Sequence, residues 1–369
     1  MNNIQNFQQK SKSIGPQQVR LLEKLCNACA VSGNEGEVRK IVMDQVKNLA
    51  DEVWVDAMGN VLAIKKGNGE NRLRVMAAAH MDEVGFMITH EEDKEAGIYR
   101  FELVGGIDLQ TLAGKQVVIG AEHIPAVIGA KPIHLTTKEE RKRNFTLDDL
   151  RIDIGPENIK KVKVGDWATY APQFVRQGSS LRTKALDDRL GVVTLIELLR
   201  HAPSHIDLLA AFTVQEEVGL RGAYVAAYSL NPQLAMVLDC TPARDLPVWE
   251  ADNRQVQDNA IYNTRLGAGP ALYIADGDTL SDPRLVRHCI DTAEALKIPY
   301  QIRQPGGGGT DAGAIHIRRS GIPSFSLSVP GRYMHTANNL IQISDWDLTY
   351  RLALAAIERL VPELLLSER

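Results

Sequence analysis

The stretch FTVQEEVG, from Phe212 to Gly219, decides the fold class of this chain. It closes an apolar run, Ile206 to Val214, that has the composition of a buried strand, and the adjacent carboxylates of Glu216 and Glu217 follow that run. An open α/β sheet places its reactive groups beyond the carboxyl ends of its strands. Neighbouring carboxylates repel each other, so a bound divalent cation would explain why two stand side by side. One carboxylate would bind the cation, and the other would be free to move protons. Two surface glutamates are the alternative, and the rest of the chain must decide between them.

The bulk composition is that of a soluble globular protein. The chain has 369 residues, a length that allows a sizeable core and two domains. Of these residues 44% are hydrophobic and 24% are charged, as in a typical globular protein. A net charge of −4 predicts no strongly basic face, and an aromatic content of 5% argues against base-stacking platforms, so we expect no nucleic-acid partner. No apolar run approaches the ~20 residues of a membrane span, so we expect no membrane partner.

The N-terminus and the cysteines indicate a cytoplasmic protein. The segment from Met1 to Pro16 is polar and lacks the apolar stretch of a signal peptide. The four cysteines do not suggest a disulfide framework. Cys26 and Cys29 form a C-x-x-C pair, but they lie in a helical pattern and no second pair exists to complete a zinc site. We therefore assign them no metal or redox role.

The pattern along the chain changes twice. Helix and strand patterns alternate up to residue 83, and from 84 to 174 short β-like runs and frequent glycines replace them, with no long helix. A charged segment, Lys138 to Arg143, is typical of a solvated loop. After Lys184 the α/β character returns. We therefore predict a small, barrel-like all-β domain, residues 84–174, inserted into an α/β domain formed by residues 1–83 and 175–369.

Individual elements of the second half can also be predicted. Asp187 and Asp188 open an apolar helix over 189–199. The pattern further predicts strands over 234–238, 299–303 and 323–329 and helices over 284–296, 311–319 and 345–360. These elements fix which polar side chains stand at the ends of strands.

Polar residues follow one apolar run after another. The residues in this setting are His80, Glu216, Glu217, Asp239 and, a few positions beyond the last strand, His335. One sheet would bring all of them to one edge. Asp187 adds a carboxylate at the start of a helix, where the partial positive charge of the helix end favours the ionised form.

This set of side chains predicts a metal site. Two imidazoles with several carboxylates suit zinc, cobalt or manganese, and they are too rich in nitrogen for a dedicated calcium or magnesium site. A single catalytic zinc needs three protein ligands, and here there are about enough for two ions joined by a bridging carboxylate. Asp82 lies two residues after His80, and its natural task would be to orient that imidazole.

With these residues the chain resembles a known family, the M42 metallo-aminopeptidases, which include the glutamyl and tetrahedral aminopeptidases. The matching stretches follow the family's order over nearly the whole chain. They are VSGNEG at 31–36, AHMDEVG at 79–85, GGID at 105–108, ALDDR at 185–189, QEEVG at 215–219, GTDAGA at 309–314 and VPGRYMHT at 329–336.

The resemblance implies a role for each site residue. One metal would be held by His80, Asp187 and Asp239, and the other by Asp187, Glu217 and His335, with Asp187 as the bridge. Glu216 would be the general base that moves a proton from a metal-bound water to the leaving amine, and Asp82 would orient His80. The implied reaction is hydrolysis of the N-terminal peptide bond of short peptides by two divalent ions per subunit, zinc, cobalt or manganese.

The resemblance also implies an architecture and an assembly. The α/β domain would be a mixed-sheet catalytic domain with helices on both faces. The inserted β region resembles the family's dimerisation domain, and family members commonly build dimers into larger shells, often of twelve subunits. We therefore expect a homo-oligomer built from dimers.

Two alternatives remain open on the residues. A related dimetal amidase, a deacylase or a carboxypeptidase, would use the same metals with a pocket for a blocked amine or a carboxylate. The second alternative is a non-catalytic scaffold that kept the fold. The presence of Glu216 argues against this alternative, because a scaffold needs no general base.

Several other features are weaker signals. Cys240, beside Asp239, is interpreted as a bystander rather than a redox-sensitive group. The segment from Ile274 to Asp278 departs from the family pattern and is a candidate part of the substrate pocket. The glycines from 306 to 309 form either a plain turn or a loop over the substrate. The other seven histidines are interpreted as structural or surface residues: His90, His123, His134, His201, His205, His288 and His316.

Overall fold

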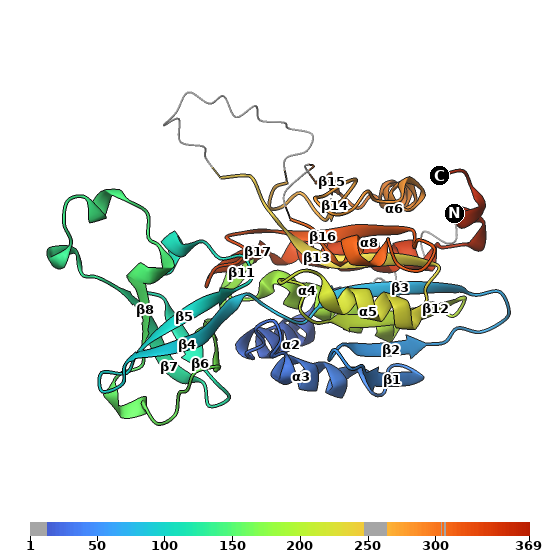
Figure 1. Cartoon of the computed structure of the whole chain (residues 1–369). Helices are drawn as coiled ribbons and strands as arrows, with labels where there is room; N and C mark the ends of the chain where they lie inside the picture. Colours follow the sequence, from blue (N-terminus) through green and yellow to red (C-terminus); the bar gives the residue numbers. More distant parts are fainter. Residues whose placement is uncertain (1–12, 247–263, 304, 306–307) are drawn as a thin grey trace.

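A computed structural model describes residues 13–246, 264–303, 305 and 308–369. Most of the N-terminal extension, from Met1 to Lys12, and two of the predicted loop glycines, Gly306 and Gly307, lie outside the described residues. In Figure 1 a large layered body carries a smaller barrel at one end.

The large body is built on one mixed sheet. Its strands lie in the order β1-β2-β12-β3-β13-β16-β17-β11-β10, with β14 and β15 attached at β16. The neighbours β12, β3, β13 and β16 are parallel, and antiparallel strands flank them. The bounds are β1 Glu52–Val55, β2 Val61–Lys65, β3 Leu73–His80, β10 Val175–Gln177, β11 Ser180–Thr183, β12 Ile206–Thr213, β13 Leu234–Pro242, β14 Ala271–Leu272, β15 Gln301–Ile302, β16 Ser324–Arg332 and β17 Asn339–Gln342.

Helices cover both faces of this sheet, as predicted. Alternate residues of each central strand belong to two different cores, because successive side chains of a strand point to opposite faces. Val75 and Ala77 face the core formed with α2, α3, α4, α6 and α8, whereas Met76 and Ala78 face the core formed with α5 and α7. The bounds are α2 Pro16–Asn27, α3 Gly36–Val46, α4 Leu186–His201, α5 Arg221–Leu230, α6 Pro283–Leu296, α7 Asp311–Ile315 and α8 Ile343–Glu358.

The smaller body is a closed barrel with a core of its own. Its strands pair in the order β4-β5-β8-β7-β6-β9 and close on themselves, which leaves no sheet edge exposed. Phe86 lies at its centre, with the rings of Phe101 and Tyr170 packed edge-on at 5.3 and 5.4 Å. The bounds are β4 Gly85–Asp93, β5 Ile98–Val104, β6 Gln116–Ile119, β7 Ile124–Ala130, β8 Leu150–Asp153 and β9 Trp167–Tyr170.

Several predicted elements begin or end at other residues in the structure. The helix predicted over 311–319 ends at Ile315, because the chain turns there and Gly321, with a φ of +97°, leads into β16. The strand predicted over 299–303 shrinks to Gln301–Ile302. The strand predicted over 234–238 continues to Pro242, because it stays paired with β16, so Asp239 lies inside a strand rather than just after one.

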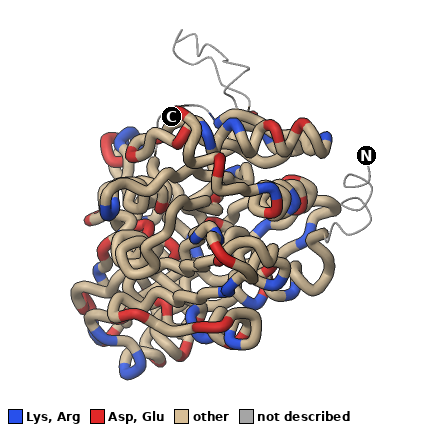
Figure 2. The backbone as a smooth tube through the Cα atoms, turned by 90° about the vertical axis from the view of Figure 1, so that its right-hand side faces the viewer, with Lys and Arg blue, Asp and Glu red and all other residues tan. Residues whose placement is uncertain are grey.

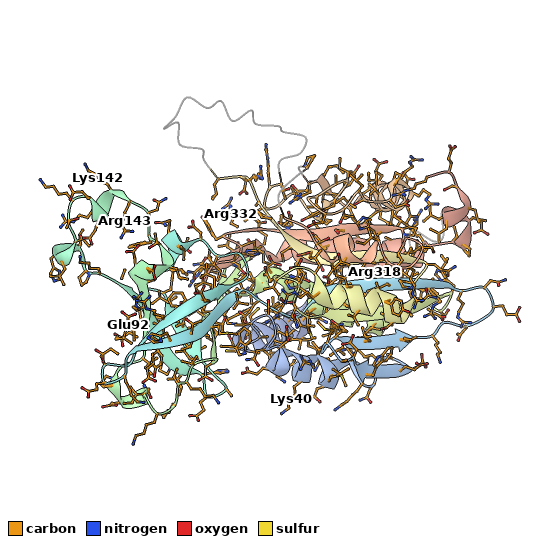
Figure 3. All side chains as sticks on the ribbon, in the orientation of Figure 1. Lys40, Glu92, Lys142, Arg143, Arg318 and Arg332 are labelled. Atoms are coloured by element: carbon orange, nitrogen blue, oxygen red, sulfur yellow. The ribbon has the colours of Figure 1, made fainter. Side chains whose placement is uncertain are left out.

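Charged side chains of both signs are spread over the surface. Figure 2 shows lysines and arginines interspersed with acids over the face it presents. In Figure 3, Lys142 and Arg143 project from the connection between β7 and β8, which agrees with the predicted solvated loop. Within the described ranges, no helix is long and apolar enough to cross a membrane.

Candidate active site

The predicted site residues meet at one edge of the large sheet. Parallel pairing sets β3 beside β12, so that His80 pairs with Thr213 and both strands end together. β13 lies on the other side of β3, and its Asp239 pairs with Ser328 of β16. This edge borders a pocket of about 480 Å³. Six of the predicted residues line the pocket: His80, Asp187, Glu216, Glu217, Asp239 and His335.

A tight turn after β12 carries the two glutamates. Gln215 has a φ of +56°, in the left-handed region, and it turns the chain just before Glu216. Asn60 fastens this turn: its Oδ1 accepts from the Val214 N–H at 3.0 Å, and its Nδ2 donates to the Gly222 carbonyl at 3.0 Å. Gly222 fits because it has no Cβ, which would lie 2.4 Å from the Val214 oxygen. The role of Asn60 could not be predicted from the sequence, because it depends on residues far along the chain.

Asp82 ties two strand ends together. Its carboxylate accepts hydrogen bonds from the backbone N–H groups of Glu216 and Glu217, at 3.0 and 3.1 Å, and from Ser32 Oγ at 2.6 Å. Its Oδ1 lies 3.5 Å from Nδ1 of His80. That nitrogen is buried and has no hydrogen-bond partner among the residues that the structure describes. Asp82 therefore lies beside His80, and it also holds the backbone of the glutamate pair, which the sequence did not reveal.

Asp187 and Asp188 differ in what they contact at the start of α4. Both have non-helical backbone angles, with ψ at 107° and 39°. Asp188 accepts from the Gly191 N–H at 3.0 Å, as a helix-capping residue does, and from the backbone N–H of His80 at 3.2 Å. Both of its oxygens are thus occupied by backbone groups. Asp187 is left to line the pocket. The sequence placed Asp188 at the start of the helix, but its hydrogen bond with the backbone of His80 was not predicted.

Asp187 lies between the two imidazoles. Its Oδ1 is 3.3 Å from His80 Nε2, and its Oδ2 is 3.6 Å from His335 Nε2. Asp239 Oδ1 lies 3.9 Å from the same nitrogen of His80, and Glu217 Oε2 lies 3.3 Å from that of His335. Ligands at about 2.1 Å around a tetrahedral cation are about 3.4 Å apart. The separations therefore suit two neighbouring cations with Asp187 between them.

Compact groups of ligand atoms at this edge agree with one predicted set and differ from the other. Asp187, Glu217 and His335 each offer a ligand atom, and all three atoms lie within 4.8 Å of one another. A second compact group joins His80 and Asp239 to Asp188 rather than to Asp187, and a third joins Asp187 and Asp188 to Cys240. We favour Asp187 as the ligand, because the oxygens of Asp188 already accept two backbone hydrogen bonds.

His335 is fixed by the connection that follows β5. Its Nδ1 lies 2.8 Å from the carbonyl oxygen of Gly106 and donates to it, so Nε2 is the nitrogen that faces Asp187 and Glu217 and that could bind a cation after losing its proton. A Cβ on Gly106 would lie 3.5 Å from the same Nδ1. Gly106 belongs to a motif that the sequence singled out without a role, and the structure places it behind a candidate ligand.

Burial governs the charges of this edge. It raises the pKa of Glu216 and of Asp239 well above the usual range of a carboxyl group, and nearby carboxylates raise both further. It also raises the pKa of Glu217 to about 7. Burial would lower the pKa of His335, but the carboxylates of Asp187 and Glu217 raise it to about 10. The pKa of Asp187 stays below its usual range, because hydrogen bonds from both imidazoles outweigh its burial.

This donor set fits divalent cations. Several buried carboxyl groups share one edge, and burial without a counter-charge disfavours their ionised forms. A bound cation reverses that balance, because carboxylates then bind in their charged form. Imidazole nitrogens beside carboxylate oxygens are the ligands of zinc, cobalt and manganese rather than of calcium.

Comparison with known proteins identifies the family. The profile of the M42 glutamyl aminopeptidase family matches residues 59–352, a range that holds every predicted site residue. This chain belongs to the M42 family. It is accordingly a peptidase, a hydrolase of peptide bonds.

Similar proteins span almost the full length of this M42 peptidase. It is 32% identical to the lysyl aminopeptidase of Pyrococcus furiosus, over 93% of this chain and 97% of that one. An aminopeptidase structure from the archaeon Desulfurococcus kamchatkensis matches with a TM-score of 0.86 and 34% identity, over 95% and 96% of the two chains. The TET1 peptidase of Pyrococcus horikoshii, described as assembling into a tetrahedron or a large octahedral shell, matches with a TM-score of 0.79 and 33% identity, over 93% and 100%.

The remaining wall of the pocket carries charge of both signs. In this M42 peptidase Arg244, Arg303 and Asp278 belong to that wall, and the Arg303 guanidinium carbon lies over the ring of Tyr273, 4.6 Å from its centroid. Asp278 is the residue of the 274–278 segment that lines the pocket, where the sequence predicted this segment to lie. Cys240 also lines it, and its thiol donates to the Leu186 carbonyl at 3.4 Å.

Proposed function

We propose that this M42 peptidase is a dimetal aminopeptidase that hydrolyses the N-terminal peptide bond of short peptides. One observation carries the proposal: the two oxygens of Asp187 lie 3.3 and 3.6 Å from the Nε2 atoms of His80 and His335. A carboxylate with an imidazole on each oxygen suits a bridge between two cations. Similarity to lysyl and glutamyl aminopeptidases supports the same class of substrate.

The proposed ligand sets follow from these distances. His80, Asp187 and Asp239 would hold one ion and Asp187, Glu217 and His335 the other, with zinc, cobalt or manganese as the metal. When bound, the ions supply Lewis acidity, which polarises the scissile carbonyl and acidifies water.

Glu216 is the proposed general base. It lines the pocket, its Oε2 lies 4.0 Å from His80 Nε2, and its backbone N–H is held by Asp82. Burial raises the pKa of its carboxyl group, which favours a group that accepts a proton from the attacking water and then gives it to the leaving amine. Asp82 acts in this proposal as a positioning residue for both His80 and the glutamate turn.

Matched peptides with free or acetylated N-termini test the reaction. The chelator-treated enzyme is resupplied with zinc, cobalt or manganese, and we expect cleavage of the free-amine set only, restored by metal. Cleavage of the acetylated set alone would move the protein to the deacylases. Loss of a C-terminal residue instead would make it a carboxypeptidase. No cleavage with any of the three metals would favour a scaffold that kept the fold.

The carboxypeptidase alternative has one observation in its favour. Arg244 and Arg303 line the pocket, and a guanidinium group is a good partner for a substrate carboxylate. The same arginines could instead receive an acidic side chain or the free C-terminus of a dipeptide. The matched peptides separate these readings, because the bond that is cut identifies the class.

Glu216→Gln tests the base. We expect the variant to bind its metals and to lose nearly all turnover, because the amide keeps the shape of the side chain but cannot take a proton. Metal content by elemental analysis and turnover under saturating substrate are the two measurements. Substantial turnover at unchanged metal content would remove Glu216 from this role.

We also propose that residues 84–174 form a dimerisation domain, and that dimers build a larger homo-oligomer of up to twelve subunits. The barrel is a separate closed body with its own core, and the similar TET1 peptidase assembles into shells. Light scattering coupled to size-exclusion chromatography measures the assembly, and a monomer at micromolar concentration would overturn the proposal.

A further inference from the structure

A second group of metal-ligand atoms lies away from the active site, where the barrel meets the sheet domain. Ligand atoms of Cys29, Glu37 and His123 all lie within 4.8 Å of one another. Cys29 follows α2, Glu37 lies in the first turn of α3, and His123 belongs to the turn between β6 and β7 of the barrel. The group therefore spans the two bodies of the molecule.

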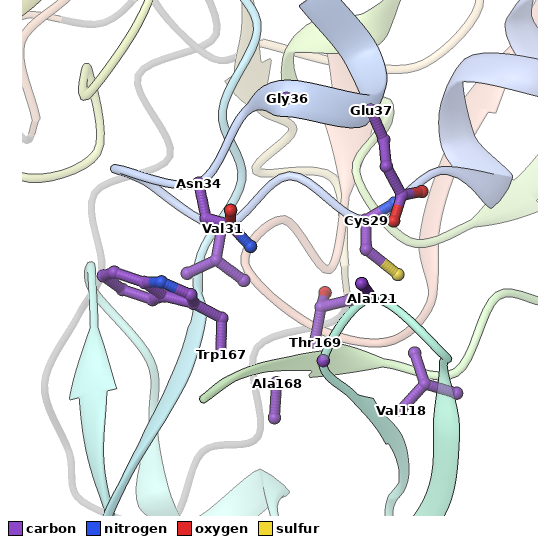
Figure 4. A pocket seen from close by; sticks show the side chains of 11 residues that line it. Cys29, Val31, Asn34, Gly36, Glu37, Val118, Ala121, Trp167, Ala168 and Thr169 are labelled. Atoms are coloured by element: carbon purple, nitrogen blue, oxygen red, sulfur yellow. The ribbon is translucent and has the colours of Figure 1, made fainter. Parts of the chain in front are cut away.

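The surroundings of the group leave space beside it. Cys29 and Glu37 line a pocket of about 250 Å³ between the start of α3 and the barrel. Figure 4 shows the Glu37 carboxylate next to Cys29, whose sulfur is directed toward the barrel loop that carries Ala121. A fourth ligand, such as water, can be accommodated on this side.

The side chains are already held close to one another. The Glu37 carboxylate accepts from the backbone N–H of Cys29 at 3.0 Å through one oxygen, and its other oxygen lies 2.7 Å from His123 Nε2. His123 has a φ of +52°, which is unusual for a residue other than glycine, and its N–H donates to the Gly120 carbonyl at 3.1 Å. A strained turn thus presents the imidazole to the sheet domain.

The chemistry of the three donors points to a zinc-type cation. A thiolate, an imidazole and a carboxylate form a mixed sulfur, nitrogen and oxygen set of the kind that zinc and cobalt bind tetrahedrally. Ligand atoms around such an ion are about 3.4 Å apart, so Glu37 and His123 would move apart by about 0.7 Å from their hydrogen-bonded distance. Both side chains can do so, because their exposed fractions are 39% and 37%.

We propose that Cys29, Glu37 and His123 form a further cation site, separate from the active site, which takes zinc or cobalt and joins the barrel to the sheet domain. This departs from the sequence-based interpretation of Cys29 and His123. The sequence holds no second cysteine pair, but the structure places Cys29 beside a carboxylate and an imidazole from other segments. Cys26 takes no part, because its thiol is buried and donates to the Ala185 carbonyl at 3.9 Å.

Cobalt spectroscopy of the full-length chain tests this site without any use of peptidase activity. Thiolate coordination to Co²⁺ gives a charge-transfer band in the near ultraviolet, whereas ligands with only nitrogen and oxygen do not. We expect the chelator-treated wild type to develop this band on cobalt titration. Cys29→Ser should lose the band, and His123→Gln should require more cobalt to develop it. Because catalysis is not the readout, failure here leaves the proposed function standing.

Cys240→Ser is the matched control, because the Cys240 sulfur lies within 4.8 Å of ligand atoms of Asp187 and Asp188 and is the other thiol that cobalt could reach. We expect this variant to keep the band. Zinc content per chain by elemental analysis should fall by one ion in Cys29→Ser and stay unchanged in Cys240→Ser. The absence of the band in the wild type at saturating cobalt, or its survival in Cys29→Ser, would overturn the proposal. Circular dichroism confirms that each variant is folded before the titration.

Discussion

Asp187 illustrates how one residue can decide a site. It lies between β11 and the regular part of α4, where its backbone angles are not helical. Each of its two carboxylate oxygens lies near one imidazole. Asp188 makes this possible, because it supplies the capping hydrogen bond of the helix and leaves its neighbour free of that task.

The bridge is testable by comparing two alanine variants. Asp187→Ala removes a ligand from both proposed ion sites, so we expect it to lose both metals. Asp239→Ala removes a ligand from only one site and should lose one ion. Elemental analysis after dialysis against metal-free buffer measures the difference. Two ions per chain in Asp187→Ala would rule out its bridging role.

The residues named from the sequence and the contacts it did not predict differ in a physical way. His80, Glu216, Glu217 and Asp239 could be named because each closes or follows an apolar run, and parallel strands bring such positions to one edge. The contacts of Asn60, Gly106 and Asp188 that were not predicted are hydrogen bonds to segments far along the chain. Such contacts depend on tertiary structure and leave no local signature.

At the scale of elements, the close packing of α5 against the end of β12 controls the glutamate turn. The N-terminal residue pair of α5 includes Gly222, where a Cβ would lie 2.3 Å from Asn60 Oδ1, 2.4 Å from the Val214 oxygen and 2.6 Å from the Val214 nitrogen. Two of these three atoms are backbone, so an added methyl group must displace the chain.

Gly222→Ala should therefore lower kcat by shifting the turn that carries Glu216. We expect a loss of stability of about 1–3 kcal/mol from overpacking and up to about 100-fold in kcat, with a smaller change in KM. Gly36→Ala is the control, because a Cβ there meets nothing within 4 Å. It should stay within about 0.5 kcal/mol of the wild type. Steady-state kinetics and urea unfolding of both variants provide the comparison.

A buried charge cluster joins several elements behind the active site. Glu83 accepts from Lys184 Nζ at 2.8 Å and from Thr169 of β9 at 2.9 Å, and Arg189 of α4 lies 3.4 Å from it. The same carboxylate accepts from the Ala30 N–H at 3.0 Å. Glu83 thus links the end of β3, the barrel and α4 through charges that are shielded from water.

Glu83→Ala should be strongly destabilising, because it leaves the buried, positively charged side chains of Lys184 and Arg189 without their shared carboxylate. We expect a loss of about 3–5 kcal/mol in the free energy of unfolding. The exposed Glu157 is the control, since its replacement by alanine should change stability by less than about 0.5 kcal/mol. Chemical unfolding measures both. A Glu83→Ala variant as stable as the Glu157→Ala variant would contradict this account.

At the scale of the whole molecule, the metal-free protein should lose stability as pH rises. The folded-state pKa of Glu217 is raised by burial from 4.5 to about 7, so its ionisation increasingly opposes folding above pH 4.5. The pKa of His335, which burial alone would lower, is raised from 6.5 to about 10 by Asp187 and Glu217, so the stability it gives when protonated is lost above pH 6.5. Both effects have the same sign, since the folded state binds more protons than the unfolded state.

Melting temperatures with and without metal check this prediction. Between about pH 5 and about pH 8 we expect the chelator-treated protein to melt at progressively lower temperature. Bound zinc should reverse the trend, because it replaces those protons and keeps the ligand carboxylates charged. The gap between the two forms should therefore widen as pH rises. A constant gap, or one that narrows, would count against a metal site built from these groups.

The arrangement of the whole chain was predictable in outline and less so in detail. The change of pattern near residues 84 and 174 predicted an all-β segment, because short β-like runs interrupted the α/β alternation, and the barrel strands β4 to β9 lie between Gly85 and Tyr170. Element ends were less well predicted: β13 extends to Pro242 because β16 continues beside it, and α7 stops at Ile315 because the chain turns. Partner strands and turns decide such boundaries, and both lie outside the local pattern.

The positions of the proposed ligands along the chain bear on how the enzyme is made. They run from His80, ahead of the barrel, to His335, close to the C-terminal helix α8. A chain emerging from the ribosome therefore lacks the second of the two proposed ligand sets until the residues just after β16 have been synthesised. Contacts between such distant segments also form late and slowly in folding. A copy that ends before His335 lacks one of the two proposed imidazole ligands, so we expect such a partial product to hold no second ion.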